Sequence, residues 1–256
     1  MKISIIQSDI IWEDRFSNFE KLEKLISPIF NQTDIIVLPE MFNTGFSMNP
    51  EKLSEPPQGE TFEWMRDLAQ KGNFGLCGSY MVKENLNFYN RWLFITPEKE
   101  IWKYDKRHLF RMGGENIIFS SGRNRLIFSF RGVRISSNIC YDLRFPVWSR
   151  NRNEYDLLIN SANWPKARKE VWNVLLKARA IENQCFVVGA NRVGTDGNGI
   201  NYCGDSVIID PRGRILTTPH PDEEESVTGE ISLTELSDFR KKFPVLGDTD
   251  DFLINF

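Results

Sequence analysis

The chain has 256 residues, a length that suits one large α/β domain. Hydrophobic residues make up 41% of it and charged residues 26%, which is ordinary for a soluble globular protein. The formal net charge of −3 favours neither nucleic acid nor an anionic membrane as a partner. No apolar run reaches the roughly 18 residues that a membrane span needs. The first seven residues read as a strand and lack the features of a signal peptide.

The cysteines are widely scattered, at Cys77, Cys140, Cys185 and Cys203. The absence of a CxxC pair argues against a zinc site, and the absence of a dense set argues against a disulfide scaffold. We therefore expect free thiols in a reducing cytoplasm. Three of them are interpreted as small core residues, because free cysteine is among the most buried residue types.

The first half of the chain predicts a β-α-β opening, which favours parallel pairing of its two strands. Apolar residues recur at helical spacing between two strand-length apolar runs. The elements predicted for this half are a strand at 3–7, a helix over 16–29, a strand at 34–38, a helix at 61–71, a strand at 74–82 and a hairpin at 90–104 that turns at 96–100.

The second half predicts a further hairpin, several strands and the strongest helix of the chain, at 166–183. The glycine-rich segment at 194–199 lacks the patterns of phosphate-binding loops and is interpreted as a flexible loop. The apolar face predicted for the helix consists of Ala167, Val171, Val174, Leu175, Ala178 and Ile181. The other predicted elements are a hairpin at 124–139, strands at 155–161, 186–191, 203–210 and 214–218, and a final strand and short helix after the acidic stretch at 222–225.

This order of elements predicts an α/β fold of mixed sheets covered by helices. We expect a single domain over residues 1–256, because no repeat, low-complexity tract or linker interrupts the sequence. Aromatic residues gather near the end of the chain, where they would suit docking on a partner subunit or could pack on their own domain. These residues are Phe239, Phe243, Phe252 and Phe256.

Cys140 stands where a buried strand is predicted to end, so a rigid scaffold would hold its thiol at a cleft, as a nucleophile requires. Glu40 ends another short apolar run and could take the thiol proton. Lys106 could favour the thiolate and donate to a developing oxyanion. On residue type alone, Glu40 could also be a cap or loop charge, and Lys106 could belong to a solvated charged face.

Five segments together resemble the nitrilase superfamily of carbon–nitrogen hydrolases. They are Leu-Pro-Glu at 38–40, Tyr-Asp-Lys-Arg-His-Leu-Phe at 104–110, Cys-Tyr-Asp-Leu-Arg-Phe-Pro at 140–146, Ser-Ala-Asn-Trp-Pro at 161–165 and Lys-Ala-Arg-Ala-Ile-Glu-Asn-Gln at 177–184. The resemblance extends from residue 1 to about 216 and implies an α-β-β-α sandwich. It also implies a homodimer, to which the C-terminal segment at about 219–256 could contribute.

The resemblance implies a Glu–Lys–Cys triad of Glu40, Lys106 and Cys140, with the backbone N–H of Tyr141 as a second oxyanion donor. The reaction would pass through a cysteine thioester and would need no metal or organic cofactor. Glu115 matches the second glutamate that often binds the lysine in this superfamily, although a surface loop charge is the alternative.

Further residues of these segments are candidates for substrate binding. Arg144 could bind a substrate carboxylate or pair with a buried acid such as Asp142. Phe42, Asn163 and Trp164 follow predicted strand ends and could line the pocket or belong to the core. A Cys–His pair using His108 is a poorer alternative, because its neighbours suggest partial burial.

Within the superfamily, the segments at 104–115 and 140–146 most resemble the ω-amidase branch. That resemblance implies a small amide as the substrate, specifically a short 2-oxo diacid monoamide such as 2-oxoglutaramate or 2-oxosuccinamate. The alternatives are another amidase, an N-carbamoyl hydrolase or a nitrilase with the same triad, or a scaffold that retains only the fold.

Overall fold

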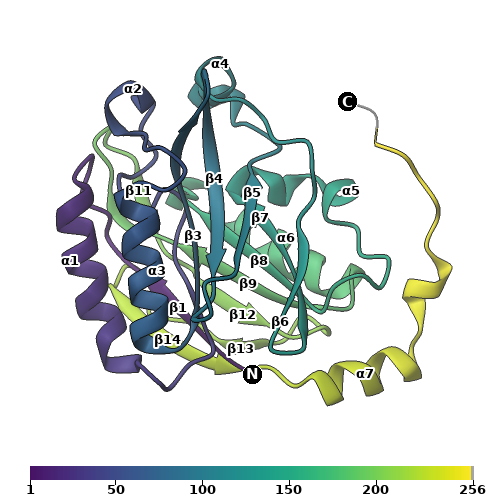
Figure 1. Ribbon diagram of the computed structural model, residues 1–256. Helices are drawn as coiled ribbons and strands as arrows, with labels where there is room; N and C mark the ends of the chain where they lie inside the picture. The colour runs from purple at the N-terminus through teal and green to yellow at the C-terminus, as the bar shows by residue number, and fades with distance from the viewer. Residues whose placement is uncertain (255–256) are drawn as a thin grey trace.

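The computed structural model describes residues 1–254, and within them the chain forms two six-stranded sheets packed face to face. Figure 1 shows the two sheets with helices on either side of them. The first sheet has the order β14-β1-β2-β3-β4-β5 and the second β13-β12-β9-β8-β7-β6. Their bounds are β1 Lys2–Gln7, β2 Ile35–Val37, β3 Gly75–Glu84, β4 Asn87–Ile95, β5 Ile101–Asp105, β6 Ile127–Phe130, β7 Val133–Ile139, β8 Leu157–Ala162, β9 Phe186–Asn191, β12 Val207–Ile209, β13 Ile215–Thr217 and β14 Glu225–Glu230.

Helices cover the outer faces of both sheets, which confirms the predicted α/β class and its α-β-β-α layers. The helix α1 (Arg15–Ile26) and the helix α3 (Glu60–Gly72) pack on the first sheet, and α6 (Lys169–Glu182) packs on the second. The remaining helices are α2 Pro50–Leu53, α4 Glu115–Ile118, α5 Pro146–Ser149 and α7 Leu233–Lys242.

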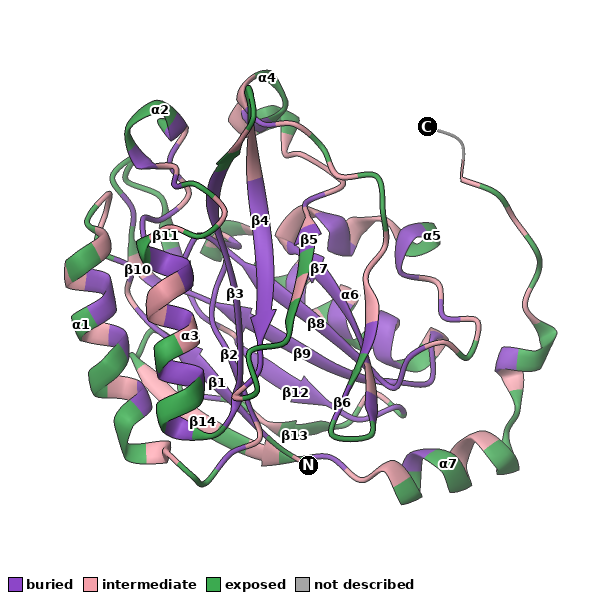
Figure 2. Ribbon diagram, in the orientation of Figure 1, coloured by how far each residue is buried: buried purple, intermediate pink, exposed green. Residues whose placement is uncertain are grey.

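The main core lies between the two sheets, where the strands are buried along most of their length (Figure 2). In each sheet, three neighbouring strands run parallel: β1, β2 and β3 in the first, and β7, β8 and β9 in the second. Because parallel strands of a sheet end at the same edge, each sheet offers a row of carboxyl ends. The candidate site forms where these two rows meet.

The buried face of α6 differs from the predicted one. Val174 and Ile181 are 62% and 54% exposed, while Trp172 and Leu176 are fully buried against the second sheet. The helix carries apolar residues around much of its circumference, so periodicity alone favoured the wrong stripe. Arg179 belongs to the buried stripe because its Nη2 donates to the carbonyl of Leu143.

The predicted strand at 203–210 is two strands, β11 (Asn201–Cys203) and β12, separated by a turn. Gly204 begins this turn with φ +75°, a left-handed conformation that glycine adopts readily. The glycine-rich segment at 194–199 joins β10 (Val193–Thr195) to β11 as a hairpin. Asp196 organises this turn, because its Oδ1 accepts hydrogen bonds from the N–H groups of Asn198 (2.9 Å) and Ile200 (3.0 Å).

The C-terminal segment packs on its own chain over its described part. Arg240 on α7 donates to Asp156 and to the carbonyls of Gln184 and Tyr155. Phe252 lies beneath the guanidinium of Arg152, at 4.5 Å from the ring centre. Phe256 lies outside the described residues. In residues 1–254, no helix is both long and apolar enough to cross a membrane.

Candidate active site

Cys140 lies directly after β7, at the first position of a short 3₁₀ helix, η3 (Cys140–Arg144). Its φ of +44° is unusual for a residue with a side chain, and such strained positions cluster at functional sites. The sharp change from strand to helix leaves the thiol at the base of a cavity. The N–H of Tyr141 lies in the first turn of η3, where backbone donors have no acceptor within the helix.

Asp142 fixes the turn between β7 and η3 through its hydrogen bonds. Its Oδ2 accepts from the N–H of Ile139 (3.0 Å) and from the hydroxyl of Tyr104 (2.7 Å). Its Oδ1 accepts from the N–H of His108 (2.8 Å) and contacts His108 Nδ1 at 2.8 Å. His108 also stacks on Phe145 with ring centres 3.7 Å apart. His108 is therefore committed to Asp142, which leaves the Cys–His alternative without support.

Glu40 follows β2 and faces the end of β8, so it bridges the two sheets. Its Oε2 accepts from the N–H of Asn163 (2.9 Å), while its own carbonyl accepts from Asn163 Nδ2 (2.6 Å). Its Oε1 accepts from Lys106 Nζ (2.7 Å) and from Asn90 Nδ2 (2.8 Å). The carboxylate is fully buried and has a donor on each oxygen, as a buried charge requires.

Lys106 and Glu115 complete a buried cluster beside Cys140. Lys106 Nζ lies 3.0 and 2.9 Å from the two carboxylate oxygens of Glu115. Glu115 Oε2 also accepts from the N–H of Phe110 at 2.6 Å. All four predicted polar side chains, Glu40, Lys106, Glu115 and Cys140, therefore meet in one place.

Asn90 on β4 belongs to this cluster and was missed by the sequence analysis. Its Nδ2 donates to Glu40 Oε1 and, at 3.0 Å, to Glu115 Oε1, so it joins the two carboxylates. Its carbonyl accepts the N–H of Lys106 at 3.0 Å. The available signal was an amide next to Arg91 in a strand that is otherwise aromatic and aliphatic from Phe88 to Ile95.

The electrostatics of the cluster keep the resting thiol protonated. Burial and the Glu40 carboxylate raise the pKa of the Cys140 thiol well above its ordinary value, while Lys106 opposes the rise. Burial alone would lower the pKa of Lys106, but the carboxylates of Glu115 and Glu40 raise it well above its ordinary value. Burial raises the pKa of Glu115, and the Lys106 ammonium partly opposes this rise. A protonated thiol beside a carboxylate needs that carboxylate as its base.

The cavity above Cys140 has a volume of about 460 Å³ and contains three of the predicted substrate-binding residues, Arg144, Asn163 and Trp164. Phe42 does not line it. Its fully buried ring packs between the first sheet and its helices, 5.7 Å from Trp64, because the chain turns back into that layer after Glu40. The cavity residues that the sequence analysis missed include Phe46, Phe110, Arg168, Asp196 and Tyr202.

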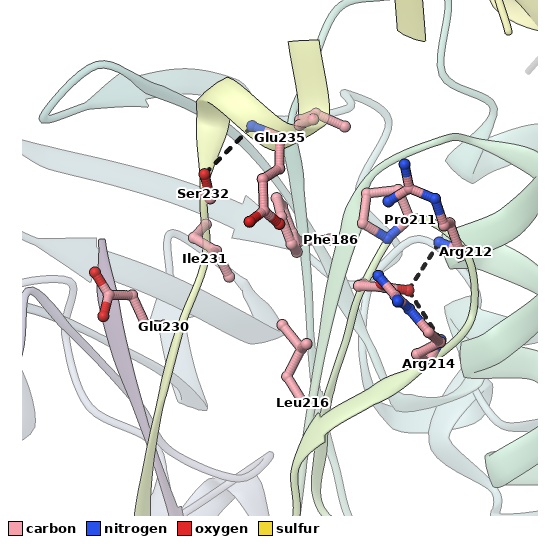
Figure 3. A pocket seen from close by; sticks show the side chains of 11 residues that line it. Phe186, Pro211, Arg212, Arg214, Leu216, Glu230, Ile231, Ser232 and Glu235 are labelled. Atoms are coloured by element: carbon pink, nitrogen blue, oxygen red, sulfur yellow. Dashed lines mark hydrogen bonds and ion pairs between the residues drawn. The ribbon is translucent and has the colours of Figure 1, made fainter. Parts of the chain in front are cut away.

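A second, smaller cavity of about 240 Å³ lies between α7 and β13 (Figure 3). It is lined by charged side chains such as Arg212, Arg214 and Glu235, and by none of the candidate site residues. Among residues 1–254, no group of three or more His, Cys, Asp or Glu side chains could hold a metal ion.

An α-β-β-α sandwich that brings a thiol, a lysine and two carboxylates to one cavity has the groups needed for covalent hydrolysis. The family model described as carbon-nitrogen hydrolase matches residues 2–241. The chain belongs to the carbon–nitrogen hydrolase family and is a hydrolase of carbon–nitrogen bonds other than peptide bonds, which confirms the resemblance to the nitrilase superfamily.

Relatives and solved structures agree with this assignment. The chain is 43% identical to Omega-amidase YafV of Yersinia enterocolitica over 254 residues, covering 99% of this chain and 98% of that protein. It is 37% identical to the 2-oxoglutaramate amidase of Bacillus subtilis, covering 96% of each chain. The crystal structure of XC1258 from Xanthomonas campestris, a CN-hydrolase superfamily protein with an arsenic adduct in the active site, matches with a TM-score of 0.97 and 40% identity, over 100% of this chain and 99% of that one.

Proposed function

We propose that the protein hydrolyses the terminal amide of short 2-oxo diacid monoamides, such as 2-oxoglutaramate and 2-oxosuccinamate, to the acid and ammonia. The observation that carries the proposal is Arg144, which lines the same cavity as Cys140. Its guanidinium lies 5.0 Å above the ring of Trp164 and has no carboxylate partner among residues 1–254. An unpaired guanidinium suits a substrate carboxylate. The names of the relatives from Yersinia enterocolitica and Bacillus subtilis support the same substrate class.

In the proposed reaction, Glu40 takes the proton of Cys140 as the sulfur attacks the amide carbonyl. Glu40 Oε1 accepts hydrogen bonds from two N–H donors, those of Lys106 and Asn90. Oε2 accepts from one N–H donor, that of Asn163. The carbonyl oxygen of Asn163 is also 3.8 Å from Cys140 Sγ. We therefore assign Oε2 as the atom that receives the proton.

The attack moves the carbonyl electrons onto oxygen, and two donors are available for this oxyanion. Lys106 has three N–H donors and three carboxylate oxygens within reach, Glu40 Oε1 and both oxygens of Glu115. One N–H shared between the two Glu115 oxygens leaves another for the substrate. The N–H of Tyr141 is the other donor. Removal of one such donor typically costs about 2.7–4 kcal/mol in the transition state.

The tetrahedral intermediate collapses when Glu40 gives its proton to the leaving nitrogen, so that ammonia departs and a thioester remains. Water then loses a proton to the same carboxylate and attacks the thioester, and the returning proton restores the Cys140 thiol. We propose a cytoplasmic location for this chemistry, because Cys140 and the other cysteines are free thiols.

The test is ammonia release from 2-oxoglutaramate and 2-oxosuccinamate by the wild type and by Cys140→Ala. We expect release that is lost in the variant, and an acyl-enzyme mass adduct on Cys140 under rapid quench. Glutamine, asparagine, an N-carbamoyl amino acid and a simple nitrile serve as comparison substrates. Faster turnover of any of these than of both 2-oxo amides would contradict the proposed substrate.

A further inference from the structure

The cavity above Cys140 contains a second guanidinium besides that of Arg144. Arg168 stands at the end of the short helix η4 (Lys166–Arg168) and lines the same cavity. Its guanidinium carbon lies 5.5 Å from the centre of the Phe110 ring, much as Arg144 lies over Trp164. Stacking on a ring holds a guanidinium in position while its N–H groups remain available at the edge.

Neither guanidinium is neutralised by the described part of the chain. No hydrogen bond or ion pair within residues 1–254 involves the side-chain nitrogens of Arg144 or Arg168, although other arginines such as Arg91 and Arg179 pair with carboxylates. Two half-buried guanidiniums without a protein acceptor in one open cavity favour an anionic ligand, because a guanidinium pairs with a carboxylate through two parallel hydrogen bonds.

Asp196 also lines the cavity, but its carboxylate is occupied by its own hairpin. Its Oδ1 accepts from the N–H groups of Asn198 and Ile200, and its Oδ2 accepts from the hydroxyl of Tyr202 at 2.9 Å. The side chain is also buried. Asp196 therefore fixes the cavity wall and leaves both arginines unpaired.

We infer that Arg168 and Arg144 form one site for the 2-oxo acid end of the substrate, and that Arg168 determines specificity for it. This inference rests on the proposed function. A 2-oxo acid presents three adjacent acceptors, two carboxylate oxygens and one ketone oxygen. One guanidinium can grip the carboxylate with two parallel hydrogen bonds, and the ketone oxygen then needs a further donor. Two arginines supply both, whereas Arg144 alone supplies only the first.

The first test compares Arg168→Met with Lys166→Met. Lys166 is a cation on the same short helix, but it is exposed and paired with Asp222, so it is a matched control. We expect Arg168→Met to lower kcat/KM for 2-oxoglutaramate about 10- to 100-fold, mainly through KM, as befits a lost charge-assisted hydrogen bond. The same variant should change kcat/KM for butyramide, which has no anionic end, less than about 3-fold. Lys166→Met should behave as the wild type.

Glutaramate isolates the contribution of the 2-oxo group, because it has the same length and charge as 2-oxoglutaramate but lacks the ketone. The wild type should prefer 2-oxoglutaramate to glutaramate, and Arg168→Met should remove most of that preference. Arg168→Lys should restore binding only in part, because a single ammonium lacks the planar fork of a guanidinium. An equal loss on butyramide, glutaramate and 2-oxoglutaramate would show a structural role and overturn the inference, as would unchanged discrimination.

A binding measurement separates this inference from the proposed activity. The product 2-oxoglutarate should protect Cys140 from alkylation by iodoacetamide in the wild type and in Lys166→Met, but not in Arg168→Met. If 2-oxoglutarate protects Cys140 only when Arg168 is present, but 2-oxo amides are not hydrolysed, the anion site is supported and the proposed function is refuted. If 2-oxo amides are hydrolysed, but 2-oxoglutarate protects Cys140 equally in the wild type and in Arg168→Met, the anion site is refuted and the proposed function is supported. Neither hydrolysis nor protection in the wild type would refute both.

Discussion

The two oxygens of Glu40 have different partners, and this asymmetry determines how the thiol is activated. Lys106 and Asn90 both donate to Oε1, so this oxygen is the better stabilised and the weaker base. Oε2 accepts from the N–H of Asn163, the residue whose carbonyl lies 3.8 Å from Cys140 Sγ. The same carboxylate raises the pKa of the Cys140 thiol, so the thiol is protonated in the free enzyme and transfers its proton only when it attacks a bound substrate.

Replacement of Glu40 by Gln should therefore separate the acidity of the thiol from its use in catalysis. Amide hydrolysis should fall about 10²- to 10⁴-fold, because the general base is lost. The thiol pKa should fall, since the carboxylate that raises it is gone while Lys106, which lowers it, remains. Alkylation of Cys140 by iodoacetamide at pH 7 should accordingly become faster, as followed by mass spectrometry.

The control for this experiment is Cys140→Ala, which reports any labelling of the three other cysteines. Burial raises the pKa of Cys77, Cys185 and Cys203, so their reaction should be slow. Slower alkylation in Glu40→Gln than in the wild type would mean that Glu40 helps the thiol to ionise at rest, and would contradict the electrostatic account.

At this scale, sequence reasoning found the residues that belong to recognisable segments. The sequence predicts Glu40, Lys106, Glu115 and Cys140 as site residues, and the structure brings them together. Asn90 was missed because an amide within a strand has no motif, and its role depends on which two carboxylates lie across the sheet. Arg168 was missed because a charge on a short surface helix resembles any solvated residue until the cavity is seen.

Among the secondary-structure elements, the turn between β11 and β12 shows why one predicted strand became two. Gly204 lies with φ +75° against Gln7, whose Nε2 donates to the carbonyls of His220 and Glu223 at 2.9 Å. Gln7 Oε1 accepts the N–H of Ser206 at 3.2 Å. A buried glutamine thus takes the place of strand pairing at this turn, an arrangement that apolar periodicity does not reveal.

Gly204→Ala should strongly destabilise the protein, both because φ is positive at this position and because a Cβ would clash with Gln7. Gly199→Ala shares only the first of these causes. Both glycines have φ near +76°, so both variants carry the left-handed penalty of about 1–2 kcal/mol. A Cβ at Gly204 would lie 1.9 Å from Gln7 Oε1, whereas a Cβ at Gly199 would meet nothing within 4 Å. Urea unfolding should show Gly204→Ala to be the less stable by at least about 1 kcal/mol. Equal losses would mean that Gln7 moves aside freely.

For the whole molecule, the continuity of the core supports the proposal that the chain is one domain. The cluster between the sheets includes residues from Ile3 to Leu236, so the two ends of the described chain share one interior. Sequence periodicity predicts the mixed sheets and their covering helices, because strands buried on both faces read as apolar runs, whereas the packing of two sheets in a sandwich was implied by the family resemblance. It could not select the covered face of α6, since that choice depends on the sheet beneath it.

The uncovered apolar residues of α6 are the best basis for the proposed homodimer. Val174 and Ile181 are more than half exposed, and they lie on one helix whose opposite face is buried. We propose that this face of α6 lies in the dimer interface, where both side chains would be covered. Among the C-terminal aromatics, Phe239 lies 4.1 Å from the Arg212 guanidinium and Phe252 lies 4.5 Å from that of Arg152, so both pack on their own chain, while Phe243 is 59% exposed.

Light scattering after gel filtration should therefore give the wild type twice the 29.8 kDa mass of the chain. The double variant Val174→Lys with Ile181→Lys should run as a monomer with unchanged circular dichroism, because a charge on each apolar residue would have to lose its water in the interface. Leu86→Lys, at a 94% exposed hairpin tip, should remain a dimer. A wild-type monomer would refute the dimer itself. A dimeric double variant would move the interface away from α6, since two opposed pairs of lysines could not be buried there without partners.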